Sequence, residues 1–328
     1  MPFILRRLVF YLVAAWVALT INFFIPRAMP GNAVQSVMAK FPNLQPSAYK
    51  ALEALLGVGH PGSIWSQYVS YLNDIFHFNF GTDVSQYPAS VSSLLAQTLP
   101  WTITLVGTAT VIAFLVGTAL GIVAGWRHGG ALDRVLPGLM FLQAIPYFFF
   151  ALILVEVLAI NTHVFPTGQG YDNGLIPGWH GDFISSALYH SLLPALTIVL
   201  TSIAGWMLQM RNVMITTIGE DYVIAAQAKG LPNRRVIFTY AARNALLPQL
   251  QGFGLAVGFV ISGALVMEIV FSYPGIGLLL LNAVTSNDYP LMQAIFLVIT
   301  FAVLIANLVV DMIIVFADPR ARTREATS

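Results

Sequence analysis

Six segments of this chain are apolar over a length that can cross a lipid bilayer as an α-helix. The apolar core of a bilayer requires about 20 residues in a helix. The six segments are residues 8–26, 99–126, 136–160, 192–214, 245–271 and 291–316. Only 9% of all residues are charged and 57% are hydrophobic, whereas soluble domains contain roughly 25% charged residues. We therefore expect an all-α polytopic membrane protein with six transmembrane helices.

The first apolar segment follows Arg6 and Arg7, as a secretory signal peptide would. Its apolar run is longer than the about 7–15 residues of a signal peptide, and the residues after it form no convincing cleavage site. We expect an uncleaved first transmembrane helix within residues 1–28 and an external subdomain of short helices at 29–97. The main transmembrane domain is expected at 98–318 and a cytosolic tail at 319–328.

The distribution of Lys and Arg predicts the orientation of the spans, because these residues concentrate in cytoplasmic loops. If the N-terminus is cytosolic, 12 of the 15 Lys and Arg residues fall in inside segments. These twelve are Arg6, Arg7, Arg127, Arg134, Arg211, Lys229, Arg234, Arg235, Arg243, Arg320, Arg322 and Arg324. The outside segments contain only Arg27, Lys40 and Lys50. We therefore expect both termini, and the loop between the fourth and fifth spans, in the cytosol.

The loop between the fourth and fifth spans, residues 215–244, is a polar segment within an apolar sequence. Residues 222–229 contain three alanines, which favour a helix and leave it slim enough to enter a groove on another protein. Gly230 can adopt a positive φ and stop this helix, and Pro232 can start a second short helix over about 232–240. We interpret the loop as a docking element joined directly to two membrane helices. On these features alone, a surface helix without a partner is the alternative.

Small residues and prolines within the spans indicate how the helices pack. Gly117, Gly121 and Gly125 recur every four residues, as do Gly254 and Gly258. Small residues on one face let helices in lipid approach closely, so ordinary helix packing explains the spacing. Prolines lack the backbone donor and bend helices. Four of them lie in or near the spans: Pro137, Pro146, Pro194 and Pro248.

The polar loop contains a recognisable series of short motifs: Asp221-Tyr222-Val223, Ala226-Gln227-Ala228-Lys229-Gly230-Leu231, Arg243-Asn244-Ala245 and Pro248. This series resembles the conserved loop of membrane permeases in binding-protein-dependent ABC importers of the dipeptide/oligopeptide type. Further matches are Arg6-Arg7, Pro30-Gly31, Gln67-Tyr68, Glu268, Phe271-Ser272-Tyr273-Pro274-Gly275-Ile276-Gly277, Asp288-Tyr289-Pro290, Asn307-Leu308-Val309-Val310-Asp311 and Asp318-Pro319-Arg320. Two departures are Ile224, at the glutamate position of the general motif, and residues 30–97, which are only loosely similar.

The resemblance implies the type I ABC importer permease fold, with a cytosolic coupling helix between spans four and five. It implies that this helix contacts an ATPase through Tyr222, Ala225, Ala226, Ala228, Lys229, Gly230, Leu231, Arg234 and Arg235. It also implies a second homologous permease subunit, two cytosolic ATP-binding subunits and an external substrate-binding protein as partners. The membrane is then the cytoplasmic, or inner, membrane of a bacterium or an archaeon.

The chain has no Gly-x-x-x-x-Gly-Lys-Ser/Thr loop for phosphate binding. We therefore expect ATP and Mg²⁺ to be bound by partner subunits and no cofactor to be bound by this chain. Its six histidines are not paired at metal-ligand spacing, and no two carboxylates are placed for acid–base catalysis. The sequence therefore favours a protein that is not an enzyme, binds no metal and has no nucleic-acid partner.

Three carboxylates fall within the predicted spans: Glu156, Glu268 and Asp311. A charge inside a membrane is expensive, and such residues often mark a functional site. These three lie near the ends of their spans, so structural hydrogen bonding and a lining or gating role are both open. Pro274 and Gly275, at the start of the last external segment, are further candidates for the pathway or its gate.

The resemblance favours the permease subunit of an ATP-driven importer of dipeptides or oligopeptides delivered by an external binding protein. Relatives of this type also carry nickel, opines or oligosaccharides, so the substrate stays open. An ion-coupled secondary transporter is a different class of function, but it favours inverted repeats and carboxylates at mid-membrane depth, and neither is evident. A membrane enzyme is the third class, and it lacks a catalytic constellation.

Overall fold

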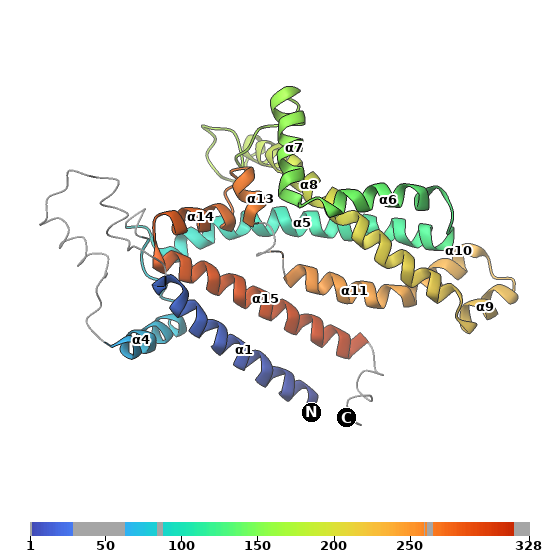
Figure 1. Cartoon of the computed structure of the whole chain (residues 1–328), viewed down its shortest axis with the longest axis horizontal. Coiled ribbons are helices and arrows are strands. Elements are labelled where there is room, and N and C mark those ends of the chain that lie inside the picture. Colours follow the sequence, from blue (N-terminus) through green and yellow to red (C-terminus); the bar gives the residue numbers. More distant parts are fainter. Residues whose placement is uncertain (1, 29–62, 84–87, 259, 261–264, 318–328) are drawn as a thin grey trace, which may run out of the picture. The chain divides into compact units, whose positions relative to one another are not determined.

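The computed structural model of the chain describes residues 2–28, 63–83, 88–258, 260 and 265–317. Within these residues every regular element is a helix (Figure 1), and the β-type pairing is one isolated bridge between Thr82 and Ser90. The expected all-α fold class is thus confirmed for this part of the chain. Residues 29–62 of the predicted external subdomain and the predicted tail at 319–328 lie outside the described residues.

The described residues form two compact units. Unit 1 consists of Met1–Trp101 and Pro274–Leu304. It contains α1 (Pro2–Arg27), α4 (Ile64–Phe76), the beginning of α5 (Val91–Trp126), α14 (Ile276–Thr285) and most of α15 (Tyr289–Ala317). The backbone N–H of Leu291 donates to the Asp288 carboxylate at 3.0 Å, which caps the first turn of α15. α14 begins directly after Gly275, which is its N-cap.

Unit 2 consists of Thr102–Tyr273 and Ile305–Ser328. Besides the rest of α5 and the end of α15, it contains α6 (Ala131–Ala144), α7 (Tyr147–Leu154), the π-helix η1 (Val155–Asn161), α8 (Gly181–Ile218), α9 (Asp221–Ala228), α10 (Asn233–Arg235), the π-helix η2 (Val236–Ala242), α11 (Arg243–Gly258) and α13 (Leu265–Val270). The 38-residue helix α8 contacts α6, α7, α9, η2 and α11. It is therefore the element that most of this unit packs against.

Four helices among the described residues are long and apolar enough to cross a membrane. They are α1 over Arg6–Ile25, α5, α8, and α15 over Tyr289–Val309. The bent pair of α6 with α7 and η1 makes a fifth if it is one span. These five correspond to the first four and the sixth of the expected segments. The fifth expected segment, 245–271, includes residues outside the described ranges, so six spans stay a prediction.

The third expected span, residues 136–160, is not one continuous helix. α6 ends at Ala144, α7 begins at Tyr147, and the pair is bent by 97° at this break. Proline lacks a backbone N–H and disfavours helical backbone in the residue before it. Ile145, which precedes Pro146, is extended at φ −76° and ψ 127°. The expected bending by proline is thus confirmed at Pro146.

The second half of α5 packs closely against α8 along its row of glycines. A Cβ atom placed on Gly121 would lie 2.6 Å from the carbonyl oxygen of Met207 and 2.6 Å from Cβ of Met210. A Cβ atom on Gly125 would lie 2.5 Å from Cβ of Met214. Only residues without a Cβ atom permit this approach, so the expected packing role is confirmed for the row of Gly117, Gly121 and Gly125. For Gly254 and Gly258 it stays a prediction.

Gly121→Ala tests how much this close approach contributes. The added methyl group meets the backbone of α8, so the two helices must separate, and overpacking of this kind costs about 1–3 kcal/mol. We expect the variant to unfold at a lower temperature than the parent in the same detergent. Gly107→Ala in the same helix is the matched control, because no atom of the described residues lies within 4 Å of its Cβ position. Equal melting temperatures for Gly121→Ala and the parent would contradict the packing.

Candidate functional site

The segment expected to dock on a partner lies at the end of α8. α8 ends at Ile218, and the backbone N–H of Gly219 donates to the carbonyl groups of the preceding turn. α9 begins at Asp221, whose carboxylate in the first turn is favourably placed toward the positive end of the helix dipole. Two residues therefore connect α8 to α9, and a movement of one helix cannot be absorbed in a long linker.

The other end of α9 is closed by a Schellman motif. The N–H of Gly230 donates to the carbonyl oxygen of Gln227 at 2.9 Å, and the N–H of Leu231 donates to that of Ala226 at 3.4 Å. Gly230 has φ +70°, a conformation that residues with a Cβ atom adopt at a cost. The expected helix and its expected stop at Gly230 are thus confirmed as local structure.

One side of α9 is anchored in an apolar cluster. Val223 is fully buried and Ala226 is 3% exposed, and their i, i+3 spacing places them on the same face. The cluster joins α5, α8, α9, η2 and α11 through Ile122, Met210, Met214, Val223, Ala226, Val236, Ala241, Ala242 and Ala245. α9 is therefore packed against the ends of the long helices rather than suspended from a loop.

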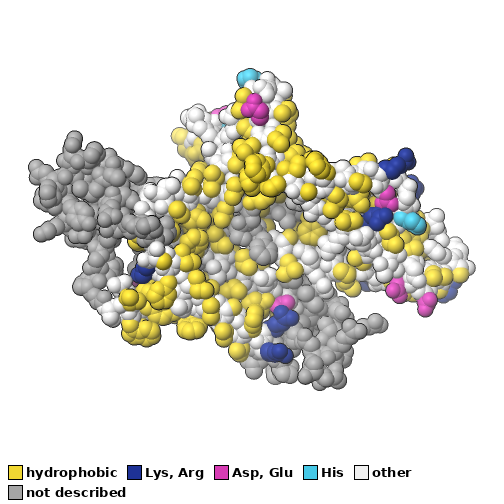
Figure 2. All heavy atoms as spheres, viewed as in Figure 1, with side chains coloured by type: hydrophobic (Ala, Val, Ile, Leu, Met, Phe, Trp, Pro, Cys, Tyr) yellow, Lys and Arg dark blue, Asp and Glu magenta, His cyan; other side chains and the backbone are white. Residues whose placement is uncertain are grey.

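The opposite side of α9 is exposed. Among the residues expected to contact an ATPase, the exposed ones are Tyr222, Ala225, Ala228, Lys229, Gly230, Arg234 and Arg235. Leu231 is half-buried, and Ala226 faces the apolar cluster. Charged side chains gather at this end of unit 2 (Figure 2). The structure thus separates Ala225 and Ala228, which are available to a partner, from Ala226, which holds the helix in place.

The second helix of the loop differs from the expectation of a short helix at about 232–240. Pro232 is its N-cap, and α10, η2 and α11 follow without a break, since the junction residues Arg235 and Arg243 are both helical. The expected end near Tyr240 is therefore wrong. The sequence contains no stop signal there, and Ala241, Ala242 and Ala245 continue the face that is buried in the cluster. The loop is joined to α11 as directly as to α8.

A partly buried ion pair connects α6 to α8 close to this element. The guanidinium of Arg211 donates from Nε to Oδ1 of Asp133 at 2.7 Å and from Nη2 to Oδ2 at 3.1 Å. The side chains are only 23% and 15% exposed, respectively. Asp133 also accepts from the backbone N–H of Gly129. This bidentate geometry fixes the beginning of α6 against the part of α8 that leads to α9.

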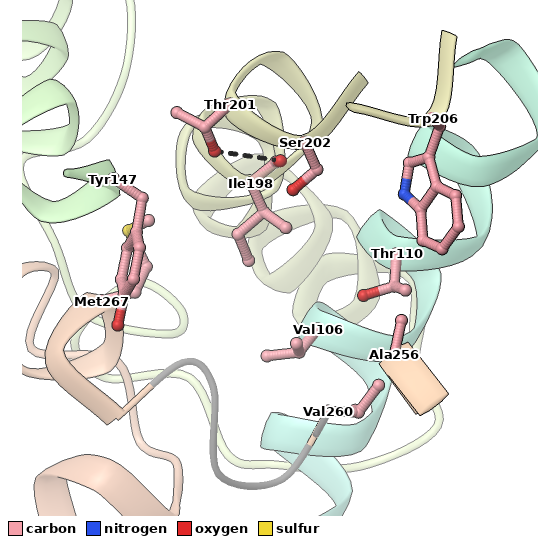
Figure 3. Close-up of a pocket in the computed structure, with 10 residues that line it drawn as sticks. All are labelled: Val106, Thr110, Tyr147, Ile198, Thr201, Ser202, Trp206, Ala256, Val260 and Met267. Carbon is pink, nitrogen blue, oxygen red and sulfur yellow. Dashed lines mark hydrogen bonds between the residues drawn. The ribbon is translucent and has the colours of Figure 1, made fainter. Parts of the chain in front are cut away.

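A cavity of about 230 Å³ lies farther along the same helices (Figure 3). Side chains of α5, α7, α8, α11 and α13 surround it. Its lining consists of Val106, Thr110, Tyr147, Ile198, Thr201, Ser202, Trp206, Ala256, Val260 and Met267. None of these ten residues is charged. The walls are apolar, with hydroxyl groups and one indole ring as the polar groups.

Gln249 joins three helices beside this cavity. Its side chain is fully buried, and its amide nitrogen donates to Oγ1 of Thr118 at 3.1 Å and to the carbonyl oxygen of Trp206 at 3.0 Å. Next to it, the rings of Phe114 and Phe253 lie 4.3 Å apart, and Phe114 meets the Trp206 ring edge-on at 5.3 Å. α5, α8 and α11 are therefore linked by a polar contact and an aromatic one.

Sequence reasoning missed this group of residues. Gln249 and Trp206 are single polar or amphipathic residues within apolar segments, and polar side chains in such positions often bond to a neighbouring helix. That signal was available in the sequence. The partners Thr118 and Phe114 carry no comparable signal, because threonine and phenylalanine are common in spans. Only the packing of the helices reveals them.

The five pathway candidates lie elsewhere, and none belongs to the lining of this cavity. Glu268 is fully buried on α13 and accepts from Oγ1 of Thr102 at 2.6 Å, which agrees with structural hydrogen bonding. Glu156 is exposed on η1 and accepts from Nδ2 of Asn161 at 3.2 Å. Asp311 is half-buried on α15; Pro274 and Gly275 directly precede α14. A pathway role for the five stays a prediction.

Comparison with known proteins gives a consistent result. Residues 117–323 match the family model described as "Binding-protein-dependent transport system inner membrane component". The chain is 30% identical to the oligopeptide transport system permease protein AppB of Bacillus subtilis, over 92% of each chain. It is 30% identical to the dipeptide transport system permease protein DppB of Escherichia coli K12, over 99% and 100% of the two chains. It is also 30% identical to the di/tripeptide transport system permease protein DppB of Pseudomonas aeruginosa, over 98% and 99%.

Gly230→Ala tests the cap of α9. A Cβ atom at positive φ costs about 1–2 kcal/mol, so we expect the end of α9 to fray and its amide hydrogens to exchange faster with solvent. Hydrogen exchange followed by mass spectrometry measures this effect. Gly219→Ala, eleven residues before it, is the matched control, because Gly219 has φ −77° and an added Cβ atom would meet its nearest neighbour at 3.5 Å. Unchanged exchange in residues 221–231 of Gly230→Ala would contradict the cap.

Proposed function

The chain belongs to the family of binding-protein-dependent transport system inner membrane components, and we propose that it is the permease subunit of an ABC importer of dipeptides or oligopeptides. The observation that carries this proposal is the similarity, over nearly the full length of both chains, to relatives named as dipeptide and oligopeptide permeases. Several apolar helices agree with a multi-pass protein of the bacterial inner membrane. Ion-coupled transport and nickel or oligosaccharide import are not favoured by these relatives.

We propose that the exposed side of α9 is the docking surface for a cytosolic ATPase subunit. Ala225 and Ala228 make this side narrow, with Tyr222 and Lys229 beside them, so it can enter a groove. Arg234 and Arg235 add positive charge next to it. The packed underside supports the proposal, because a push on α9 is passed to α8 and α11 rather than lost in local motion.

The complete importer in this proposal has six spans in this chain and both its termini in the cytosol. It contains a second homologous permease, two ATP-binding subunits that hold ATP and Mg²⁺, and an external binding protein that delivers the peptide. The cavity of about 230 Å³ is smaller than the roughly 300–1,000 Å³ of usual ligand pockets. We propose that the second permease completes it as the translocation path.

The contacts of α11 and α8 provide a route from the docking surface to this cavity. α11 continues without a break from α10 and η2, and it carries Gln249. Gln249 donates to the backbone of Trp206, whose ring lines the cavity. The side-chain oxygen of Gln249 is buried and has no hydrogen-bond partner among the described residues. A buried acceptor without a partner costs about 1–3 kcal/mol, so we propose that it gains a partner in another state of the transport cycle.

An uncharged cavity is consistent with transport of peptides of different sequence. A conduction path must bind its solute strongly enough to admit it and weakly enough to release it. Hydroxyl groups of Thr110, Tyr147 and Ser202 can bond to a peptide backbone, whereas a fixed charge would retain one end of a zwitterion. Selection of the substrate is therefore left to the external binding protein.

Reconstitution of the four-subunit complex in liposomes, with the binding protein, tests the function directly. We expect ATP on the ATPase side to drive uptake of a radiolabelled dipeptide, and we expect uptake to continue when ionophores collapse the membrane potential. Uptake that needs the potential but not ATP would instead establish the ion-coupled alternative. A complex that takes up nickel or an oligosaccharide but no peptide would contradict the proposed substrate class.

Ala225→Trp tests docking on α9. The bulky indole prevents α9 from entering the groove of the ATPase. We therefore expect at least a tenfold loss of ATP-driven uptake and loss of the ATPase subunits on purification. Ala144→Trp is the control, since Ala144 is also exposed but lies at the far end of α6. Both variants should reach the membrane in normal amounts. Full uptake by Ala225→Trp would refute the docking surface.

Gln249→Leu tests the route to the cavity. The substitution conserves size but removes two hydrogen bonds, worth about 1 kcal/mol each. We expect the assembled complex to hydrolyse ATP while transporting several-fold fewer peptides per ATP. Gln251→Leu is the matched control: the residue type and the helix are the same, but Gln251 is exposed. An unchanged ratio of peptide transport to ATP hydrolysis in Gln249→Leu would contradict the proposed connection from α9 through Gln249 to the cavity.

A further inference from the structure

Helix α4, in unit 1, has three chemically different faces. The first face packs on α1. The hydroxyl of Tyr68 lies 2.7 Å from Oγ1 of Thr20, and Nδ2 of Asn22 donates to the hydroxyl of Tyr71 at 3.0 Å. Phe23 of α1 is fully buried, and the centroid of its ring lies 5.2 Å from that of Tyr68. α4 is thereby fixed to α1 by aromatic and polar contacts.

These contacts lie in the last turns of the apolar part of α1, which ends at Ile25. Just beyond, the guanidinium of Arg27 lies 3.6 Å above the Phe23 ring and donates to the Phe23 carbonyl oxygen at 2.8 Å. Arginine at the end of a span marks the polar edge of the bilayer. α4 is therefore attached to α1 at the level where hydrocarbon gives way to head groups.

The second face of α4 is apolar and largely exposed among the described residues of unit 1. This face consists of four residues at positions i, i+4, i+7 and i+11, a spacing that places them on one side of a helix. They are Trp65, Val69, Leu72 and Phe76. Trp65 is 71% exposed, Val69 49% and Phe76 76%, and Leu72 is half-buried beside the face that packs on α1. Such a stripe of large apolar side chains is costly in water.

The third face is polar and exposed, with Ser66, Ser70 and Asn73. One helix thus presents a face to protein, a face suited to hydrocarbon and a face suited to water. An apolar face beside a polar one is typical of helices that lie in the plane of a membrane surface. Tryptophan and other aromatic residues are enriched at that depth.

We infer that α4 lies along the bilayer surface, with Trp65, Val69 and Phe76 inserted among the lipids beside the end of α1. Lipid is the occupant favoured by continuity: Ile21 and Phe24 of α1 are 52% and 50% exposed and belong to a helix apolar enough to span the membrane. The inserted stripe anchors the end of α1 at a fixed depth. The inference requires α1 to cross the membrane, but it does not depend on what the protein transports.

The absence of cysteine in the chain permits a direct test with single labels. Val69→Cys and Ser70→Cys are neighbours on the apolar and polar faces, and each is labelled with bimane in the assembled complex in liposomes. We expect bimane at residue 69 to be quenched by doxyl groups near the lipid head groups and to be several-fold less quenched by iodide in water than bimane at residue 70. Phe76→Cys and Asn73→Cys form a second pair in case the first does not fold.

Two results would overturn the inference. Equal quenching by iodide at residues 69 and 70 would place both faces in water. Protection of residue 69 from both iodide and doxyl lipid would show that protein covers the stripe, whether a second permease or the binding protein. Because the test measures only lipid contact, its failure leaves ATP-driven uptake of peptides untouched, and failure of that uptake leaves this test intact.

Discussion

The apolar cluster beneath α9 is the contact on which the proposed function depends. Val223 and Ala226 are buried among Met210 and Met214 of α8 and the small residues of η2 and α11. A helix of eight residues is not stable alone in water, so α9 exists as a helix because this face is packed. The same packing leaves the opposite face free for a partner. The stability of α9 and its availability to the proposed ATPase partner therefore both follow from the division of the helix into a buried side and an exposed side.

A second constraint fixes the distances within unit 2. The glycine row of α5 brings its backbone against α8, and the Arg211–Asp133 pair holds the beginning of α6 to the same helix. α8 is therefore held to α5 and to α6 by two independent contacts. Gln249 extends this rigid arrangement to the wall of the cavity. In the proposed function, energy enters at α9 and solute passes at the cavity, and coupling between two such sites is carried by packed elements with discrete arrangements.

Much of this arrangement could be predicted from the sequence, because it depends on local signals. Apolar length predicted the four long apolar helices and the bent pair of α6 with α7 and η1. Four-residue glycine spacing predicted the close contact of α5 with α8, and Gly230 predicted the end of α9. What could not be predicted depends on tertiary contacts. Three alanines in one short helix look alike in sequence, yet only packing decides that Ala226 is inside while Ala225 and Ala228 are outside. The continuation of α10 through η2 into α11, and the cavity itself, likewise arise from the way neighbouring helices meet.

The most direct test of the account is the reactivity of a cysteine on the exposed face of α9. The chain has no cysteine of its own, so Ala228→Cys introduces a single thiol. Its alkylation rate by a water-soluble maleimide is measured in the permease pair alone and after the ATP-binding subunits have assembled on it. The account predicts rapid alkylation in the first case and at least tenfold slower alkylation in the second. The same rate in both cases would mean that the ATPases do not cover α9, and the central claim would be wrong.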